Sequence, residues 1–384
     1  MTLNKKVLAG LVALAAASTS AQAVTLVAED GWEVKVGGMI NQFVTFSDNG
    51  NGGDDVNEVR DGLLPAFLNF DFKAPTMNGL DIAAHISISP STNTDSYGAT
   101  TPVGGSGLEQ REVYFTVDGS FGQILAGKAL GLYGSHNILT DQTLWGVGYG
   151  TGSNLQTTLG GIGLGYDYAA WRSQVRWTSN DMNGFKIALS VNDNAGSATS
   201  LSGKPTGSVL TGARDSEDFR YEGDLSYAGT FDSGSFSAWL SAMHQGDDVA
   251  NGVDASDDEQ AWTVGGTLVY GGFEAMAQYS DSEGSLFGAV DSEWNQFIVQ
   301  AGYRFAGTTL VSVNYSELED DSSNAVRTAL YGNPSDDTID KVTVGVYHDV
   351  NANLKLVAEY TSVEDDVNTG LDQDIYSLGG FVFF

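Results

Sequence analysis

The sequence predicts an all-β protein, a transmembrane antiparallel β-barrel of about sixteen strands. Three observations support this prediction. Apolar and polar residues alternate in many segments, short turns alternate with long polar connections along the chain, and the last strand ends on an aromatic residue, Phe384. Because successive side chains of a strand point to opposite faces, such a sheet presents one face to lipid and the other to water.

The chain opens with a segment typical of a secretory leader. Lys5 and Lys6 precede an apolar stretch, 7–17, which is too short to span a bilayer, and Ala21-Gln22-Ala23 follows it. A positive start, a short apolar run and a small-x-small ending form the pattern that signal peptidase cleaves. We therefore expect a signal peptide over residues 1–23, cleavage between Ala23 and Val24, and one barrel domain over residues 24–384.

The composition excludes several classes of function. The 384 residues include no cysteine, which excludes disulfides, thiolate nucleophiles and zinc–thiolate sites. The formal net charge of -32 opposes binding to nucleic acid. After the leader, no window reaches the roughly 18 apolar residues that a transmembrane helix needs. A mean hydropathy of -0.12 agrees with strands that are apolar on one side only.

The alternation of apolar and polar residues is clearest in 80–88, 185–191, 341–347 and 354–361. In the first of these, Leu80, Ile82 and Ile86 share one face, and the intervening residues share the other. Similar segments begin near Trp32, Leu64, Gly79, Glu109, Ser120, Trp171, Gly184, Glu217, Asp232, Glu259, Gly272, Glu293, Thr308, Ile339, Ala352 and Asp374.

The connections between these strands alternate in length, which predicts short turns on one rim and long loops on the other. The short ones contain the Gly and Asn residues expected of hairpins, as in Met77-Asn78-Gly79 and Met182-Asn183-Gly184. Other short turns are expected at 118–119, 271–272, 306–307 and 351–352, and long loops at 47–63, 89–108, 129–170, 193–216, 246–258, 282–292, 318–338 and 363–373.

A soluble β-sandwich or a β-helix is the alternative fold, because both also alternate. A regular rhythm of short and long connections over the whole chain is unusual for a sandwich. The last strand adds a second argument, since Tyr376, Leu378, Val382 and the terminal Phe384 lie on one face. Such an ending resembles the signal that the barrel-assembly machinery reads in outer-membrane barrels, so Phe384 is the candidate assembly signal.

Three stretches resemble known sequences in order and spacing. Residues 31–38, GWEVKVGG, resemble the opening strand of the Gram-negative porins; residues 109–128 resemble their fourth and fifth strands; and residues 377–384 resemble their closing strand. The resemblance covers essentially the whole mature sequence. It implies a homotrimer of sixteen-stranded barrels in the outer membrane, through which ions and small hydrophilic solutes diffuse passively. In that family the third long loop folds inward and narrows the channel.

The third long connection, 129–170, has a composition unlike that of the others. It is apolar and rich in glycine, and only Asp141 and Asp167 are acidic between residues 131 and 170. Exposing so much apolar surface to water is unfavourable, so we expect this loop to pack inside the lumen. Its middle, 138–145, is expected to form a helical turn.

Placing the apolar face of each strand outward points a set of charges into the lumen. The porin resemblance implies a basic wall that faces acids on the third loop and so sets up a transverse field. Arg111 shares its parity with lipid-facing Val113 and Phe115, so either a bulge resets the register or Arg111 lies at the rim. The alternative for each charge is an ordinary solvated lumen residue. The constriction candidates are Lys35, Lys73, Arg111, Asp141, Arg172 and Arg176, and further lumen-lining candidates are Asp71, Lys186, Arg220 and Glu222.

Three outer stretches concentrate acidic residues. Residues 246–259, 317–340 and 363–374 carry six, seven and five acids, with one base among them. Such runs are usually solvated surface. They are also suited to concentrating cations at the pore mouth, or to holding divalent cations that bridge to phosphates of lipopolysaccharide. We expect no other cofactor and no dedicated metal site.

The remaining question is what kind of channel the barrel forms. A general diffusion channel is the first interpretation, and a substrate-specific channel for a sugar or a small anion is the alternative. A closed structural barrel is a further rival. Catalysis is not expected, because the four histidines, His85, His136, His244 and His348, belong to no recognisable nucleophile–base pattern. Outer-membrane lipid and lipopolysaccharide are the expected surroundings.

Overall fold

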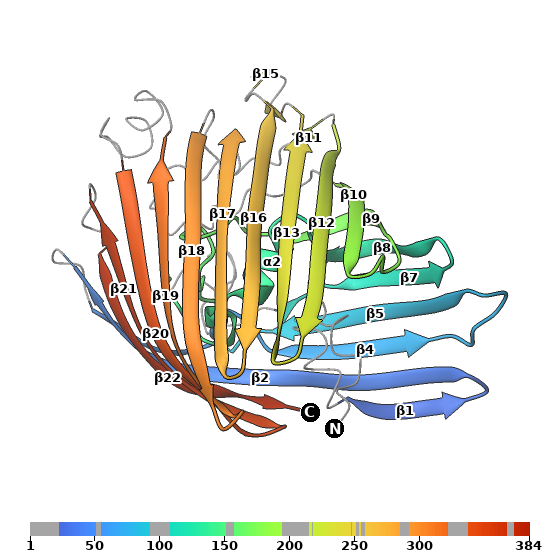
Figure 1. Ribbon diagram of the computed structural model, residues 1–384, viewed down its shortest axis with the longest axis horizontal. Helices are drawn as coiled ribbons and strands as arrows, with labels where there is room; N and C mark the ends of the chain where they lie inside the picture. The colour runs from blue at the N-terminus through green and yellow to red at the C-terminus, as the bar shows by residue number, and fades with distance from the viewer. Residues whose placement is uncertain are drawn as a thin grey trace, which may run out of the picture.

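The computed structural model describes residues 23–50, 55–92, 108–150, 157–193, 215–216, 218–246, 248–250, 253–254, 258–284, 292–321, 337–366 and 372–384. They form a closed antiparallel barrel of sixteen strands with a loop inside it (Figure 1). The barrel strands are β2 (Trp32–Asn49), β4 (Phe67–Lys73), β5 (Asp81–Pro90), β7 (Val113–Gly119), β8 (Gly122–Leu130), β9 (Trp171–Thr178), β10 (Phe185–Asn192), β12 (Arg220–Phe231), β13 (Gly234–Gln245), β16 (Glu259–Tyr270), β17 (Phe273–Gly284), β18 (Ser292–Phe305), β19 (Thr309–Asp320), β20 (Asp337–Asn351), β21 (Leu354–Asp365) and β22 (Gln373–Phe383).

Several shorter elements complete the described chain. The segment β3 continues the line of β4 along β2 beyond an interruption at 61–66, and two short helices lie in the loop 131–170. The shorter elements are β1 (Val24–Glu29), β3 (Val56–Arg60), β6 (Leu108–Glu109), β11 (Asp215–Ser216), β14 (Asp248–Ala250), β15 (Val253–Asp254), the α-helix α2 (Ser135–Thr140) and the 3-10 helix η2 (Gln142–Trp145).

The barrel closes between its first and last strands. β2 pairs with β22 from Met39↔Phe383 to Asn49↔Gln373. Phe384 extends this ladder by one residue, because its N–H donates to the Gly38 carbonyl at 3.0 Å and its carbonyl accepts from the Gly38 N–H at 2.7 Å. β1 occupies the remaining length of the same edge, so β1 and Phe384 follow one another along β2 (Figure 1).

The two faces of the barrel wall differ as the alternation predicts. On β16, Trp262, Val264 and Leu268 point outward and are 41%, 44% and 49% exposed, whereas Thr263 between them points inward and is fully buried. The outward face is therefore apolar, as contact with lipid requires.

Aromatic rings gather at two levels of this outer face. Near the short turns, Phe273 and Tyr303 lie 4.8 Å apart, and towards the long loops Trp262 and Tyr279 lie 5.5 Å apart. On β16 the two levels are marked by Trp262 and Tyr270, which are separated by about 26 Å along the strand. Two aromatic girdles at this spacing are the pattern of a transmembrane barrel.

The predicted strands are confirmed, each starting within four residues of its expected position. The turns at Asn78-Gly79 and Asn183-Gly184 have positive φ at both residues, which is the type I′ geometry that joins antiparallel strands. The sequence did not predict β1 or β3. Almost all of the expected leader lies outside the described residues. Parts of all eight expected long loops also lie outside them, including residues 151–156 of the loop 129–170.

Candidate functional site

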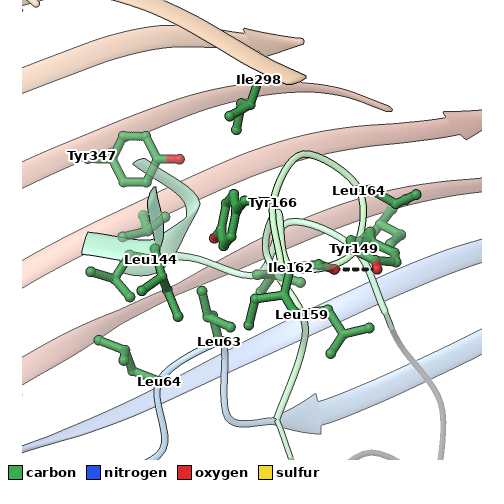
Figure 2. Close-up of a cluster of buried hydrophobic side chains, with 14 of the residues drawn as sticks. Leu63, Leu64, Leu144, Tyr149, Leu159, Ile162, Leu164, Tyr166, Ile298 and Tyr347 are labelled. Carbon is green, nitrogen blue, oxygen red and sulfur yellow. Dashed lines mark hydrogen bonds between the residues drawn. The ribbon is translucent and has the colours of Figure 1, made fainter. Parts of the chain in front are cut away.

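The loop between β8 and β9, which we call the inward loop (131–170), packs its apolar side chains against the barrel wall. Leu144, Tyr149 and Ile162 of the loop lie in one buried cluster with Ile298 and Tyr347 of the wall (Figure 2). Burying these side chains removes them from water, which is why an apolar loop folds into the lumen. The prediction for this loop is confirmed.

The helical turn expected near 138–145 is present as α2 followed by η2. Asp141 joins the two helices, because its carboxylate accepts hydrogen bonds from the Thr143 N–H at 2.8 Å and the Thr143 hydroxyl at 2.6 Å. It also accepts one from the Tyr166 hydroxyl at 2.7 Å. Asp141 is only 2% exposed, so its carboxylate organises the loop from within.

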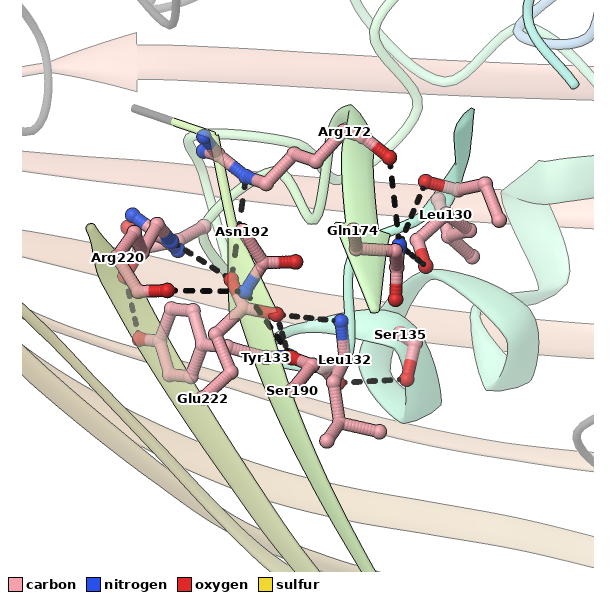
Figure 3. Close-up of polar contacts among 12 residues, drawn as sticks. Leu130, Leu132, Tyr133, Ser135, Arg172, Gln174, Ser190, Asn192, Arg220 and Glu222 are labelled. Carbon is pink, nitrogen blue, oxygen red and sulfur yellow. Dashed lines mark hydrogen bonds and ion pairs between the residues drawn. The ribbon is translucent and has the colours of Figure 1, made fainter. Parts of the chain in front are cut away.

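Glu222 of β12 anchors the start of the inward loop. One of its oxygens accepts hydrogen bonds from the Leu132 N–H at 2.6 Å and the Tyr133 N–H at 3.1 Å (Figure 3). The other oxygen lies 2.6 Å from Nε of Arg220 and 3.8 Å from Nε of Arg172. All three charged side chains are buried, so this cluster binds the loop to the wall through charge-assisted hydrogen bonds.

Glu359 of β21 anchors the middle of the loop in the same manner. Its carboxylate accepts hydrogen bonds from the Val147 N–H at 2.7 Å and the Gly148 N–H at 3.0 Å. The hydroxyl of Tyr347 donates to the second oxygen at 2.6 Å. Glu359 was not among the residues predicted from the sequence, although its inward parity on β21 was a signal that it faces the lumen.

Asp167 anchors the end of the loop from the loop side. Its carboxylate accepts hydrogen bonds from the Tyr133 hydroxyl at 2.7 Å, from Nε2 of Gln296 at 2.7 Å and from the Ser282 hydroxyl. Burial raises the pKa of Asp167, because the charged carboxylate is held away from water. Burial also raises the pKa of the Tyr133 phenol, and the neighbouring Asp167 adds to that effect.

A row of neutral polar side chains on the wall supports the same loop. Trp239 donates to Asn137 at 2.9 Å, and Gln300 bonds both the Gln142 N–H at 3.1 Å and the Thr140 carbonyl at 2.6 Å. These wall residues come from β13 and β18, so the loop is fastened across the arc from β12 to β21. Sequence reasoning missed this row, since uncharged lumen residues carry no distinctive motif.

The interrupted second strand also supports the inward loop. Segment 61–66 turns inward, where the Leu64 carbonyl accepts from Nδ2 of Asn41 at 2.7 Å and the Leu63 N–H donates to the Gly146 carbonyl at 2.9 Å. The interruption thus replaces a stretch of wall with a second inward support for the loop.

The opposite arc of the wall carries inward-facing charges. Asp71 of β4 lies 2.7 Å from Nδ1 of His85 on β5, and the other ring nitrogen of His85 lies 3.5 Å from Glu112. The His85 ring stacks on Tyr114 at a centroid distance of 5.1 Å. Arg176 on β9 shares the inward parity of buried Arg172. These groups form a charged strip across β4, β5, β7 and β9.

A bulge accounts for the parity of Arg111. Ile86 lies opposite Val113, whereas Ser89 lies opposite Glu109, so three steps along one strand match four along its neighbour. The extra residue resets the register between β6 and β7, and Arg111 is buried, at 8% exposure, rather than projecting at the rim.

The remaining predicted residues lie close to the short turns. Lys35 forms an ion pair with Glu33 at 2.9 Å, and Lys73 lies 3.8 Å from Asp81. Lys186 is the second residue of β10 after the turn at 183–184. Lys35 is six residues from Asn41 on the same strand, about 20 Å from the level of the loop. The structure thus brings Arg172, Arg220 and Glu222 together at the start of the loop and places Asp141 at the junction of its two helices. Lys35, Lys73 and Lys186 lie elsewhere.

Within the described ranges, no group of three or more His, Cys, Asp or Glu side chains is arranged to hold a metal ion. No helix in the described part of the chain is long and apolar enough to cross a membrane.

Comparison with known proteins gives one family match and many structural matches. The model of the Gram-negative porin family matches residues 10–368. A search of curated proteins found no match.

The structural matches cover nearly the whole chain at low sequence identity. An anion-selective porin from Comamonas acidovorans is 17% identical, with a TM-score of 0.64 over 92% of this chain and 100% of its own. OmpF of Salmonella typhi in complex with daunomycin is 14% identical, with a TM-score of 0.64 over 94% and 100%. The trimer form of the outer membrane protein OmpT of Vibrio cholerae is 14% identical, with a TM-score of 0.57 over 92% and 100%. At these identities the likeness concerns the fold.

Proposed function

The chain belongs to the Gram-negative porin family, and from that premise we propose that its barrel conducts ions and small hydrophilic solutes past the inward loop. It is an outer-membrane channel for passive diffusion. Its family and its fold are those of a channel rather than an enzyme.

One observation carries the proposed path. The inward loop is fastened by Glu222, Asp167 and Glu359 to the arc from β12 to β21, while the charged strip with Asp71, His85 and Arg176 faces inward from the other arc. A loop held to one side of a barrel narrows the lumen without closing it, and solutes then pass between the loop and the charged strip.

Liposome swelling tests this proposal directly. Liposomes that contain the purified protein should swell in isotonic solutions of small neutral solutes, and the rate should fall as the solute becomes larger. Protein that has been unfolded by heat before reconstitution is the control. Swelling no faster than that of the control, for even the smallest solute, would contradict a diffusion channel.

The charges that select ions belong to this proposal. We assign Arg176, Arg111 and Asp71 to the ion path, because they face inward from the arc that the loop leaves uncovered. Arg172, Arg220, Glu222 and Asp141 act on it through the position of the loop. Lys35, Lys73 and Lys186 act at the short-turn mouth.

The assembly is proposed to be a homotrimer. The trimer form of Vibrio cholerae OmpT, which shares the fold, supports this state. Native mass measurement in detergent tests it, and a mass of one barrel under mild conditions would contradict it.

The surroundings of the barrel follow from its place in the outer membrane. We propose that residues 1–23 are removed on export, in agreement with β1, which begins at Val24. We propose further that the barrel-assembly machinery reads the strand ending in Phe384. We also propose that divalent cations bridge the acidic outer loops to phosphates of lipopolysaccharide.

A further inference from the structure

A pocket of about 580 Å³ lies between η2 of the inward loop and the short turns that end β18 and β20. Its walls come from the loop and from strands β18 to β22, so it lies inside the lumen on the short-turn side of the constriction. A volume of this size is within the range of ligand pockets, roughly 300–1,000 Å³.

Aromatic rings form the apolar side of the pocket. Trp145 of the loop lines it together with Tyr347 and Phe383 of the wall. The Trp145 ring is held in place by edge contacts, with centroid distances of 5.6 Å to Phe381 and 5.9 Å to Phe383. Tyr347 and Phe383 are only 3% and 7% exposed, so Trp145 provides most of the ring surface that a solute contacts. A fixed ring offers contact area at little cost in conformational entropy, which suits it to a flat or ring-shaped solute.

The polar side of the pocket carries charges that compensate one another. Arg304 binds Glu274 through two hydrogen bonds, of 2.5 and 3.1 Å, and its guanidinium lies 3.8 Å from Asp349. Lys355 forms an ion pair with Asp349 at 2.5 Å. Arg304, Lys355 and Asp349 line the pocket, and Glu274, which lies behind Arg304, brings the sum of these four charges to zero. Such a group offers fixed donors and acceptors without favouring an ion of either sign.

One side-chain atom of a residue that lines the pocket has no partner within the described structure. Oε1 of Gln142 is buried and makes no hydrogen bond, although the backbone N–H of the same residue bonds Gln300. Leaving a buried amide oxygen without a hydrogen bond is unfavourable. A ligand hydroxyl, which both donates and accepts, would satisfy this atom in either orientation of the amide.

We propose that this pocket binds an uncharged sugar, a mono- or disaccharide, as it leaves the constriction. The C–H groups on one face of a sugar ring suit the aromatic wall, and its hydroxyl groups suit Gln142 and the compensated charges. This inference rests on the proposed channel function, because the lumen must admit the solute. It assigns to the barrel a preference among the solutes that diffuse through it.

Titration calorimetry of the purified full-length protein with maltose tests the proposal. Saturable binding is expected, and Trp145→Ala should weaken it about tenfold or more, since buried aromatic contacts dominate such sites. Gln142→Ala should weaken it about fivefold, which corresponds to one neutral hydrogen bond. This second variant keeps the backbone bond of Gln142, so it tests the pocket without loosening the loop. Trp262→Ala, on the outer face, is the matched control and should leave binding unchanged.

Absence of saturable binding, equal affinity in Gln142→Ala and the unaltered protein, or binding of citrate in place of maltose would each overturn the proposal. The experiment also separates this inference from the channel function. Saturable binding by a protein that does not make liposomes swell would support the sugar site and contradict the channel. Swelling without saturable binding would support the channel and contradict the sugar site.

Discussion

The carboxylate of Glu359 on the barrel wall accepts a 2.7 Å hydrogen bond from the backbone N–H of Val147 at the middle of the inward loop. The two residues are 212 positions apart in the chain. Glu222 does the same at the start of the loop. Because backbone N–H groups inside a protein must find acceptors, wall carboxylates placed opposite them fix where the loop lies.

Glu359→Gln should loosen the middle of the loop. The amide retains one acceptor oxygen but presents an NH₂ group where a carboxylate oxygen now accepts. Hydrogen bonds to charged groups contribute about 1.5–3 kcal/mol, so we expect a loss of roughly that size. Thermal unfolding should show a lower midpoint, and single-channel recording should show a noisier open-channel current. Glu364→Gln, at an exposed position on the same strand, is the control, and equal behaviour of the two variants would contradict the anchor.

Gly146→Ala should disturb the same contact from the loop side. A Cβ at this position would lie 1.9 Å from Oε1 of Glu359, so either the loop or the Glu359 side chain must move. We expect a stability loss similar to that of Glu359→Gln, measured by the same thermal midpoint. Gly223→Ala is the matched control, because its Cβ would meet only an ordinary contact of 3.6 Å with Leu189. No difference between the two glycine variants would count against this account.

Arg176→Gln should make the channel more cation-preferring. A unit charge acts on an ion roughly 10 Å away in water with about 0.4 kcal/mol. This energy corresponds to a factor of about two for each ion, so the cation-to-anion permeability ratio should rise by about twofold to fourfold. The reversal potential in a salt gradient measures it. Arg172→Gln, which removes a partner of buried Glu222, should lower the thermal midpoint and change the reversal potential less than Arg176→Gln does. A larger change of reversal potential in Arg172→Gln than in Arg176→Gln would contradict these placements.

The raised pKa of Asp167 predicts a pH dependence of stability. A carboxyl group whose pKa is higher in the folded protein than in the unfolded chain contributes stability at low pH and loses that contribution as pH rises through its folded value. The window therefore begins near the ordinary value of 3.8 and extends above it. Asp167→Asn should reduce the change of the thermal midpoint with pH in this window, whereas the control Asp366→Asn should not. An unchanged pH dependence in Asp167→Asn would exclude Asp167 as its source.

Deleting Phe384 should impair assembly. The deletion removes both main-chain hydrogen bonds to Gly38 at the closing seam. Phe384→Ala keeps these bonds and removes only the ring, so it separates closure of the seam from recognition of the side chain. The measurement is the amount of heat-modifiable barrel in the outer membrane. Unchanged amounts for the deletion would contradict both roles of the residue.

The strands were predictable from the sequence because alternation and turn chemistry are local signals. The inward loop was predictable as well, since its apolar composition requires burial. The interruption at 61–66 was not predictable, because the backbone groups of this segment form hydrogen bonds with residues outside it, Asn41 and Gly146. The role of Glu359 was hidden for the same reason, since its partners lie far away in the chain and only the closed barrel brings them together.

Single-channel recording in planar bilayers tests the central claim most directly. A trimeric diffusion channel with an anchored inward loop should show ohmic conductance steps that rise in proportion to salt concentration and appear in groups of three. The open-channel current should become noisier in Glu359→Gln but not in Glu364→Gln. A preparation of folded, correctly assembled protein that shows no conductance steps would contradict this claim.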